Sequence, residues 1–138
     1  MDEIIKYNPS MLSELTGQTN SFCSMSVDTH ENKLLLYKAM NNPDKRIGDC
    51  INMEIRIKDV YCEVAKLVNK DTGEIEYVPR TVLIDDKGIS YQAISKGVFT
   101  AVSKLFQVFG APTWCDPITV KVRQISKGDR NILTLDVI

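Results

Sequence analysis

Apolar and polar positions alternate along residues 49–57, and this is the clearest repeating pattern in the chain. The apolar positions in this segment are Ile51, Met53, Ile55 and Ile57. A period of two is typical of a β-strand that places one face in the core. The alternation slips near Asp59 and Val60, yet residues 61–68 remain rich in strand-forming side chains. The pattern predicts one long strand bent by a β-bulge, which helps a sheet to curl.

Similar strand patterns recur further along the chain. They cover residues 75–84, 89–94, 118–123 and 133–137, and turns are expected at 69–74, 85–88 and 126–131. Pro79 cannot donate a ladder hydrogen bond, so the second strand is expected to have an edge or a bulge at this residue.

A single helix is predicted between the third and fourth strands. Ser95 suits the N-cap position, and Gly110 and Pro112 end the helical pattern. Apolar side chains follow at helical spacing: Val98, Ala101, Val102, Leu105, Phe106 and Phe109. Three strands, one helix and two strands, in that order, predict a mainly β protein whose core is an OB-fold-like, five-stranded Greek-key barrel.

The region before the barrel is predicted to be an N-terminal extension. Residues 1–20 are polar and weakly patterned, and residues 21–27 suit a short strand. Asp28 or Thr29 then caps a helix that runs to about Met40. The sequence therefore predicts an extension over residues 1–46 and a barrel domain over residues 47–138.

Composition restricts the class of protein. The chain has 138 residues, of which 43% are hydrophobic, and this is enough for one ordinary core. Its four cysteines show no C-x-x-C spacing, so we expect reduced thiols and no metal or cofactor. Neither a signal region nor an apolar run of membrane-spanning length occurs, so a cytoplasmic protein without membrane contact is expected.

The charge distribution bears on nucleic-acid binding. With 17 basic and 18 acidic residues the chain has no global positive field. Basic residues nevertheless outnumber acidic ones in the last strands, where the sequence has Lys121, Arg123, Lys127 and Arg130. Arg56, Lys58 and Arg80 occupy polar positions of their strands and would extend a cationic groove over the barrel. Each of these residues also suits an ordinary solvated surface.

Single-strand binding also needs flat side chains on which unpaired bases can stack. The candidates are Tyr61, Tyr77, Tyr91 and Trp114. Each tyrosine equally suits a core or rim position, and Trp114, which lies between prolines, suits a plug at the bottom of the barrel. The helix aromatics Phe106 and Phe109 are expected in the core.

One segment carries a family resemblance. Residues 81–96 read TVLIDDKGISYQAISK. Together with the apolar helix and the closing hairpin, they resemble the single-stranded DNA-binding proteins of small protein-primed tailed phages. The chain also resembles related proteins of phages and mobile elements of Gram-positive bacteria, in which segments like residues 37–44, YKAMNNPD, recur. The resemblance covers about residues 49–138.

This resemblance implies a small OB-like protein that coats displaced single strands during phage DNA replication or recombination and protects them from nucleases. Family members stack bases on tyrosines, and the tyrosine before the Ala-Ile-Ser-Lys segment matches Tyr91. The implied partners are single-stranded DNA and phage replication or recombination proteins. The long N-terminal extension departs from the shortest members, and it is a candidate for self-association into a homo-oligomer.

Catalysis is not expected. His30 is the only histidine, and Asp85 and Asp86 lie in a predicted hairpin turn where aspartate favours the backbone geometry. The chain contains no phosphate-binding loop and no nucleophile elbow. A duplex-reading role for the apolar helix is disfavoured because Lys96 and Lys104 are its only cations.

The sequence thus predicts a sequence-independent single-stranded DNA-binding protein. Its groove is expected across the first three strands, with Tyr91, Tyr61 and Tyr77 stacking on bases. The residues expected at phosphates are Arg56, Lys58, Arg80, Lys121, Arg123, Lys127 and Arg130. The alternative is an OB-type protein–protein interaction module or phage regulator that does not bind nucleic acid. Affinity that falls steeply with salt would distinguish the two.

Overall fold

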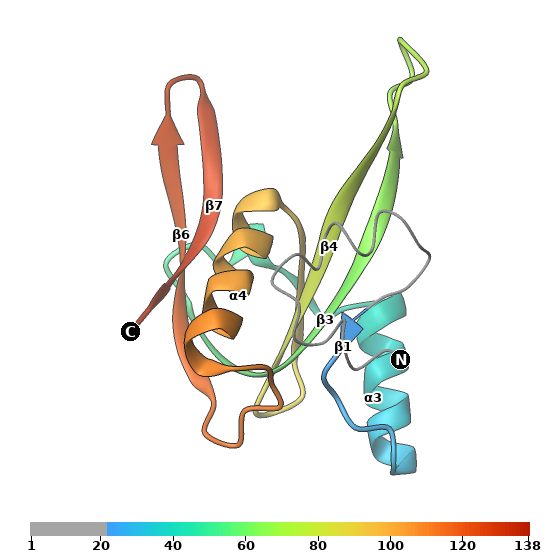
Figure 1. Ribbon diagram of the computed structural model, residues 1–138, viewed down its shortest axis with the longest axis vertical. Coiled ribbons are helices and arrows are strands. Elements are labelled where there is room, and N and C mark those ends of the chain that lie inside the picture. The colour runs from blue at the N-terminus through green and yellow to red at the C-terminus, as the bar shows by residue number, and fades with distance from the viewer. Residues whose placement is uncertain (1–21) are drawn as a thin grey trace.

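The longest strand of the fold is β3 (Glu54–Val68), in a computed structural model that describes residues 22–138. It pairs antiparallel with β4 (Ile75–Asp85) on one side and with β6 (Ile118–Lys127) on the other (Figure 1). The register between β3 and β4 shifts between Ile57 and Asp59, so one strand carries an extra residue there. The bulge predicted near Asp59 is confirmed, and it bends β3 so that the sheet curls.

The described strands form one curled sheet in the order β2-β5-β4-β3-β6-β7, and β1 (Phe22–Cys23) pairs with β3. In this order β5 (Ser90–Ile94) lies near one edge and β7 (Arg130–Val137) forms the other. The ladder therefore leaves the barrel open between these two strands, and α4 (Lys96–Phe109) lies between the two hairpins (Figure 1). This curled half-barrel confirms the predicted mainly β, OB-like fold.

The helix α4 begins and ends where its sequence predicts. The Ser95 hydroxyl accepts a hydrogen bond from the Val98 N–H, which satisfies one of the free donors of the first turn. At the other end Gly110 has a φ of 82°, a conformation that other residues adopt only with strain. The buried face of α4 covers the inner side of the sheet, where the core lies. Its members are Val98, Phe99, Val102 and Leu105.

A second helix covers the outer side of the sheet. The helix α3 (His30–Asn41) begins after Thr29, whose hydroxyl accepts from the Asn32 N–H, as the predicted cap requires. Its Ala39 packs in a smaller cluster with Tyr61 and Val82 on the outer face of β3 and β4. The predicted N-terminal helix and short strand are thus confirmed, whereas residues 1–20 lie outside the described residues.

Two boundary predictions were wrong. The first long strand begins at Glu54 rather than at residue 49, because residues 47–49 form a 3₁₀ turn and Asn52 has a φ of 70°. The last turn is also shorter than residues 126–131, since Lys127 pairs with Arg130 and only two residues connect the strands. Gly128, with a φ of 61°, allows this tight connection and so lengthens the final hairpin.

The two-residue strand β2 (Lys45–Arg46) was not predicted. It pairs in parallel with Tyr91 and Gln92 of β5. Two residues are too few for an alternation to be recognised, so the sequence pattern gave no signal for this strand.

Candidate nucleic-acid interface

Tyr91 lies in the main core and is only 7% exposed. Its hydroxyl donates to Asp85 at 3.2 Å, and the Lys45 ammonium lies 5.8 Å from the centre of its ring. Burial and the Asp85 carboxylate together raise the pKa of Tyr91 to about 12. The ring therefore presents little face to solvent, and its predicted stacking role stays a prediction that needs the ring to be uncovered.

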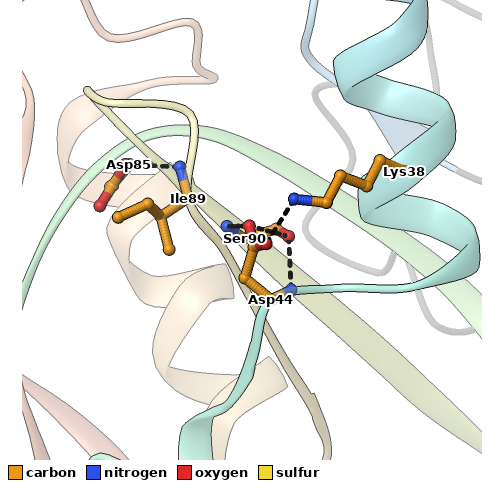
Figure 2. Close-up of polar contacts among 5 residues, drawn as sticks. All are labelled: Lys38, Asp44, Asp85, Ile89 and Ser90. Carbon is orange, nitrogen blue, oxygen red and sulfur yellow. Dashed lines mark hydrogen bonds and ion pairs between the residues drawn. The ribbon is translucent and has the colours of Figure 1, made fainter.

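The segment that passes beside Tyr91 is held by a polar cluster (Figure 2). The Asp44 carboxylate accepts from the Ser90 N–H at 3.0 Å and forms an ion pair with Lys38 of α3. The Lys38 hydrogen bond and then the Ser90 N–H lower the pKa of Asp44 below its usual value of 3.8. These contacts fix α3 and β2 against β5, and they explain why β2 covers this edge of the sheet.

Tyr61 and Arg80 lie on the outer side of the sheet, in a polar network at the margin of the α3 contact. Tyr61 is 3% exposed and donates to Glu63 at 2.6 Å. Arg80, which is 9% exposed, donates to Glu63 at 3.2 Å and to Gln92 at 2.9 Å. The guanidinium is already neutralised by Glu63, so Arg80 is not positioned as an open phosphate contact.

Several predicted cations share the solvent-facing side of β3, β6 and β7 with carboxylates. Arg56 forms an ion pair with Asp86 at 2.8 Å, and Arg123 pairs with Asp136 at 3.3 Å. The Asp86 carboxylate raises the pKa of Arg56, and Arg56 lowers that of Asp86. We call this surface the outer charged face, and it consists of Glu54, Arg56, Lys121, Arg123 and Asp136.

Lys121 lies at the centre of the outer charged face. The strand registers place it directly opposite Glu54 on one side and Asp136 on the other. Cross-strand neighbours of opposite charge attract each other, so this face offers mixed rather than purely positive charge. Lys58 lies at the β3 bulge beyond this face and is exposed.

Tyr77 is the predicted stacking residue that is well exposed. It belongs to the β3–β4 hairpin, whose part beyond Val64 and Pro79 projects from the barrel and is called the first arm here (Figure 1). Tyr77 is 49% exposed and lies directly opposite Lys66, on the side of the hairpin that continues the core face. An open ring beside an ammonium group is the combination that single-strand binding uses.

The β6–β7 hairpin forms a second projecting element, which we call the C-terminal arm (Figure 1). Lys127 and Arg130 lie opposite each other next to its turn, and both are exposed. Among residues 22–138 neither forms an ion pair with a carboxylate. These two charges are therefore available to an anionic ligand.

The structure places the predicted residues on several surfaces rather than along one groove across the first three strands. Tyr91 lies in the core, and Tyr61 and Arg80 lie in a buried network. Arg56, Lys121 and Arg123 belong to the outer charged face. Tyr77, Lys58 and the tip of the C-terminal arm remain open. The contact of any of these side chains with DNA stays a prediction.

Sequence reasoning missed a groove between α4 and the C-terminal arm, of about 1260 Å³. Its lining includes Lys96, Lys104 and Phe109 of α4. The expectation that Phe109 is a core residue was wrong, because this last residue of the helix is 49% exposed. Lys96, Thr100 and Lys104 recur every four residues, and this spacing was the available signal for a polar stripe on the helix.

Residues 22–138 contain no group of histidine, cysteine, aspartate or glutamate that could hold a metal ion. Within the same residues, no helix is long and apolar enough to cross a membrane.

Residues 16–138 match the family model described as phage single-stranded DNA-binding protein. The chain belongs to this family. The match confirms the resemblance recognised in residues 81–96, and it begins before α3, so the phage single-stranded DNA-binding family region includes α3 and β2 as well as the barrel. No curated protein and no solved structure gives a significant match to the chain.

Proposed function

We propose that this protein binds single-stranded DNA without sequence preference and coats displaced strands during phage replication or recombination in the host cytoplasm. Membership of the phage single-stranded DNA-binding family carries this proposal. The exposed Tyr77 beside Lys66 supports it, because a ring and a cation together serve the base and the phosphate of an unpaired nucleotide.

The near-neutral charge of the chain fits such a role when the charges are considered locally. The net charge is −1, so affinity must come from a local cluster and from stacking. Lys127 and Arg130 at the C-terminal arm provide unpaired positive charge, and Tyr77 on the first arm provides a ring. We infer that the two arms, rather than the outer charged face, make the principal contacts.

Fluorescence anisotropy of a labelled thirty-base oligothymidine, titrated at low and moderate salt, tests the function directly. Binding to the single strand that weakens with salt, with little binding to the matched duplex, is the expected result. Protection of the oligonucleotide from a single-strand nuclease would test the coating role.

Tyr77→Ala tests the stacking contact. Loss of one stacked base costs about 1–3 kcal/mol, so affinity should fall between about fivefold and more than a hundredfold. Tyr37→Ala is the matched control, because Tyr37 is also exposed but lies on α3. Equal effects of the two substitutions would remove Tyr77 from the interface.

A protein–protein interaction module is the second candidate. The solvent side of α3 exposes Leu34, Tyr37 and Met40 at a spacing of three residues, which favours contact with an apolar protein surface. An absence of oligothymidine binding even at low salt would make this the leading function.

A further inference from the structure

The groove between α4 and the C-terminal arm, called the α4 groove from here on, is bordered by a close contact between α4 and β7. At the start of α4, Gly97 lets the helix backbone approach β7 closely. A Cβ atom at Gly97 would lie 2.1 Å from the Leu133 carbonyl oxygen and 3.0 Å from the Ile132 side chain. The helix and the hairpin are therefore in tight contact at this end, and the groove of about 1260 Å³ is lined by Gly97, Ile132 and Leu133 of this contact.

The α4 groove is positively charged. Its basic lining residues are Lys96, Lys104, Lys127 and Arg130. Asp136 is the carboxylate of the lining, and it already pairs with Arg123 on the outer charged face. Lys96 forms an ion pair with Glu76 at 3.4 Å, but both side chains are more than 60% exposed, so solvent weakens this pair. The groove thus keeps most of its charge available for a polyanion.

The same groove is lined by exposed apolar side chains. Phe109 is 49% exposed and Val108 75% exposed at the end of α4, and Ile125 is 48% exposed on β6. Exposed apolar surface gathered in a concavity with a polar rim is typical of an interaction site. A single strand of nucleic acid has flat, weakly hydrated base faces and charged phosphates, and so matches both parts of this lining.

The cations also follow a line. Lys96, Thr100, Lys104 and Val108 lie every four residues and so share one face of α4. The helix has 14 residues and is about 21 Å long, which is enough to follow several nucleotides. Lys127 and Arg130 line the same groove from the C-terminal arm, so positive charge borders it on both sides.

We propose that the α4 groove holds single-stranded DNA, with Lys104 at a phosphate and Phe109 against a base. This inference rests on the proposed function, and it adds two α4 residues that the sequence prediction placed outside the site. The path of the DNA then follows α4 and the C-terminal arm, with Tyr77 on the first arm as a further contact, rather than the body of the sheet formed by the first three strands.

Lys104→Gln and Lys33→Gln form a matched pair for the test by anisotropy. Each removes one exposed positive charge from a helix, but Lys33 lies on α3, away from the groove lining. Loss of one phosphate contact should lower the salt slope by about 0.7, which corresponds to about fivefold weaker binding at 0.1 M salt. Lys33→Gln should leave the slope unchanged.

Fluorine NMR of the protein labelled with 4-fluorophenylalanine gives a readout that does not depend on affinity. The chain has four phenylalanines, and Phe109→Leu identifies the signal of Phe109 by its loss. Oligothymidine should shift this signal, whereas the buried Phe22 and Phe99 should keep theirs. Thermal melts of the variants establish that each one is folded.

The outcomes separate the two proposals. If the unmodified protein does not bind oligothymidine, the proposed function itself fails. If it binds while Lys104→Gln behaves like Lys33→Gln and the Phe109 signal stays in place, the α4 groove is not the DNA site and the function stands. A Phe109 signal that moves with protein concentration in the absence of DNA would instead assign the groove to a second copy of the chain, which overturns this inference.

Discussion

Gly97→Ala is the substitution for which helix propensity and tertiary structure predict opposite signs. Alanine is favoured over glycine in a helix by about 1 kcal/mol, so the sequence alone predicts a more stable protein. In the structure the added Cβ would lie 2.1 Å from the Leu133 carbonyl oxygen. Carbon and oxygen atoms in such contacts are normally separated by about 3.3 Å or more, so α4 and β7 would have to move apart by about 1 Å.

The size of the effect follows from these two terms. Forcing an extra methyl group into a packed contact typically costs about 1–3 kcal/mol. The upper part of this range, about 2–3 kcal/mol, applies here because the contacted atom is a backbone carbonyl oxygen rather than a flexible side chain, and the propensity gain of about 1 kcal/mol offsets part of it. We therefore expect a net loss of about 1–2 kcal/mol in the free energy of unfolding. For a domain of 138 residues this lowers Tm by roughly 3–10 °C.

Urea unfolding followed by far-ultraviolet circular dichroism and by the fluorescence of the buried Trp114 measures this change. Gly48→Ala is the matched control, because a Cβ at Gly48 meets nothing within 4 Å and its φ is not positive. That control should be neutral or stabilising by up to about 1 kcal/mol. If Gly97→Ala is as stable as Gly48→Ala, α4 does not pack against β7 at Gly97 as described. The contact that borders the α4 groove would then be wrong.

Three further predictions concern polar and buried groups. Because Lys38 lowers the pKa of Asp44 in the folded state, the pair stabilises the protein above the ordinary pKa of 3.8 and this contribution is lost as the pH falls through the folded value. Asp44→Asn should therefore lose less stability than the parent as the pH falls through the ordinary pKa of 3.8 and below it, and parallel curves of urea midpoint against pH would contradict the ion pair. Asp59 is 4% exposed and accepts from two hydroxyl groups, so Asp59→Ala should cost about 1–3 kcal/mol in urea unfolding, and an unchanged midpoint would count against this network. Tyr91→Ala should cost about 3–5 kcal/mol because it empties a core position, whereas a folded, equally stable variant that binds oligothymidine poorly would restore Tyr91 to the interface.

Local patterns predicted most of the secondary structure. The cap at Ser95, the end at Gly110 and the bulge after Ile57 depend on residues close in sequence, and the structure has all three. Where local geometry departs from the repeating pattern, as in the 3₁₀ turn at residues 47–49, the strand boundary was misplaced. The order of the strands and the helix was sufficient to predict the fold class, because few architectures have three strands followed by one helix and two more strands.

The candidate site was less predictable, because a strand pattern tells which residues share a face and not what covers that face. Tyr61 lies on the side opposite the core, as an exposed residue would, yet it packs in the cluster formed with α3. Tyr91 lies beside β2, a contact between segments about 45 residues apart. Exposure at both tyrosines is thus decided by segments distant in the sequence.

The sequence by itself determined the helices α3 and α4, the longer strands, their order and the barrel type, because these depend on spacing along the chain, and the resemblance in residues 81–96 indicated the family. Only the tertiary structure decided which aromatic rings remain open and where positive charge is left uncompensated. The four-residue spacing of Lys96 and Lys104 is visible in the sequence, but the α4 groove exists only because the ladder stays open between β5 and β7 and α4 packs against β7 through Gly97. Such a surface depends on the packing of three segments at once, and no local pattern contains that information.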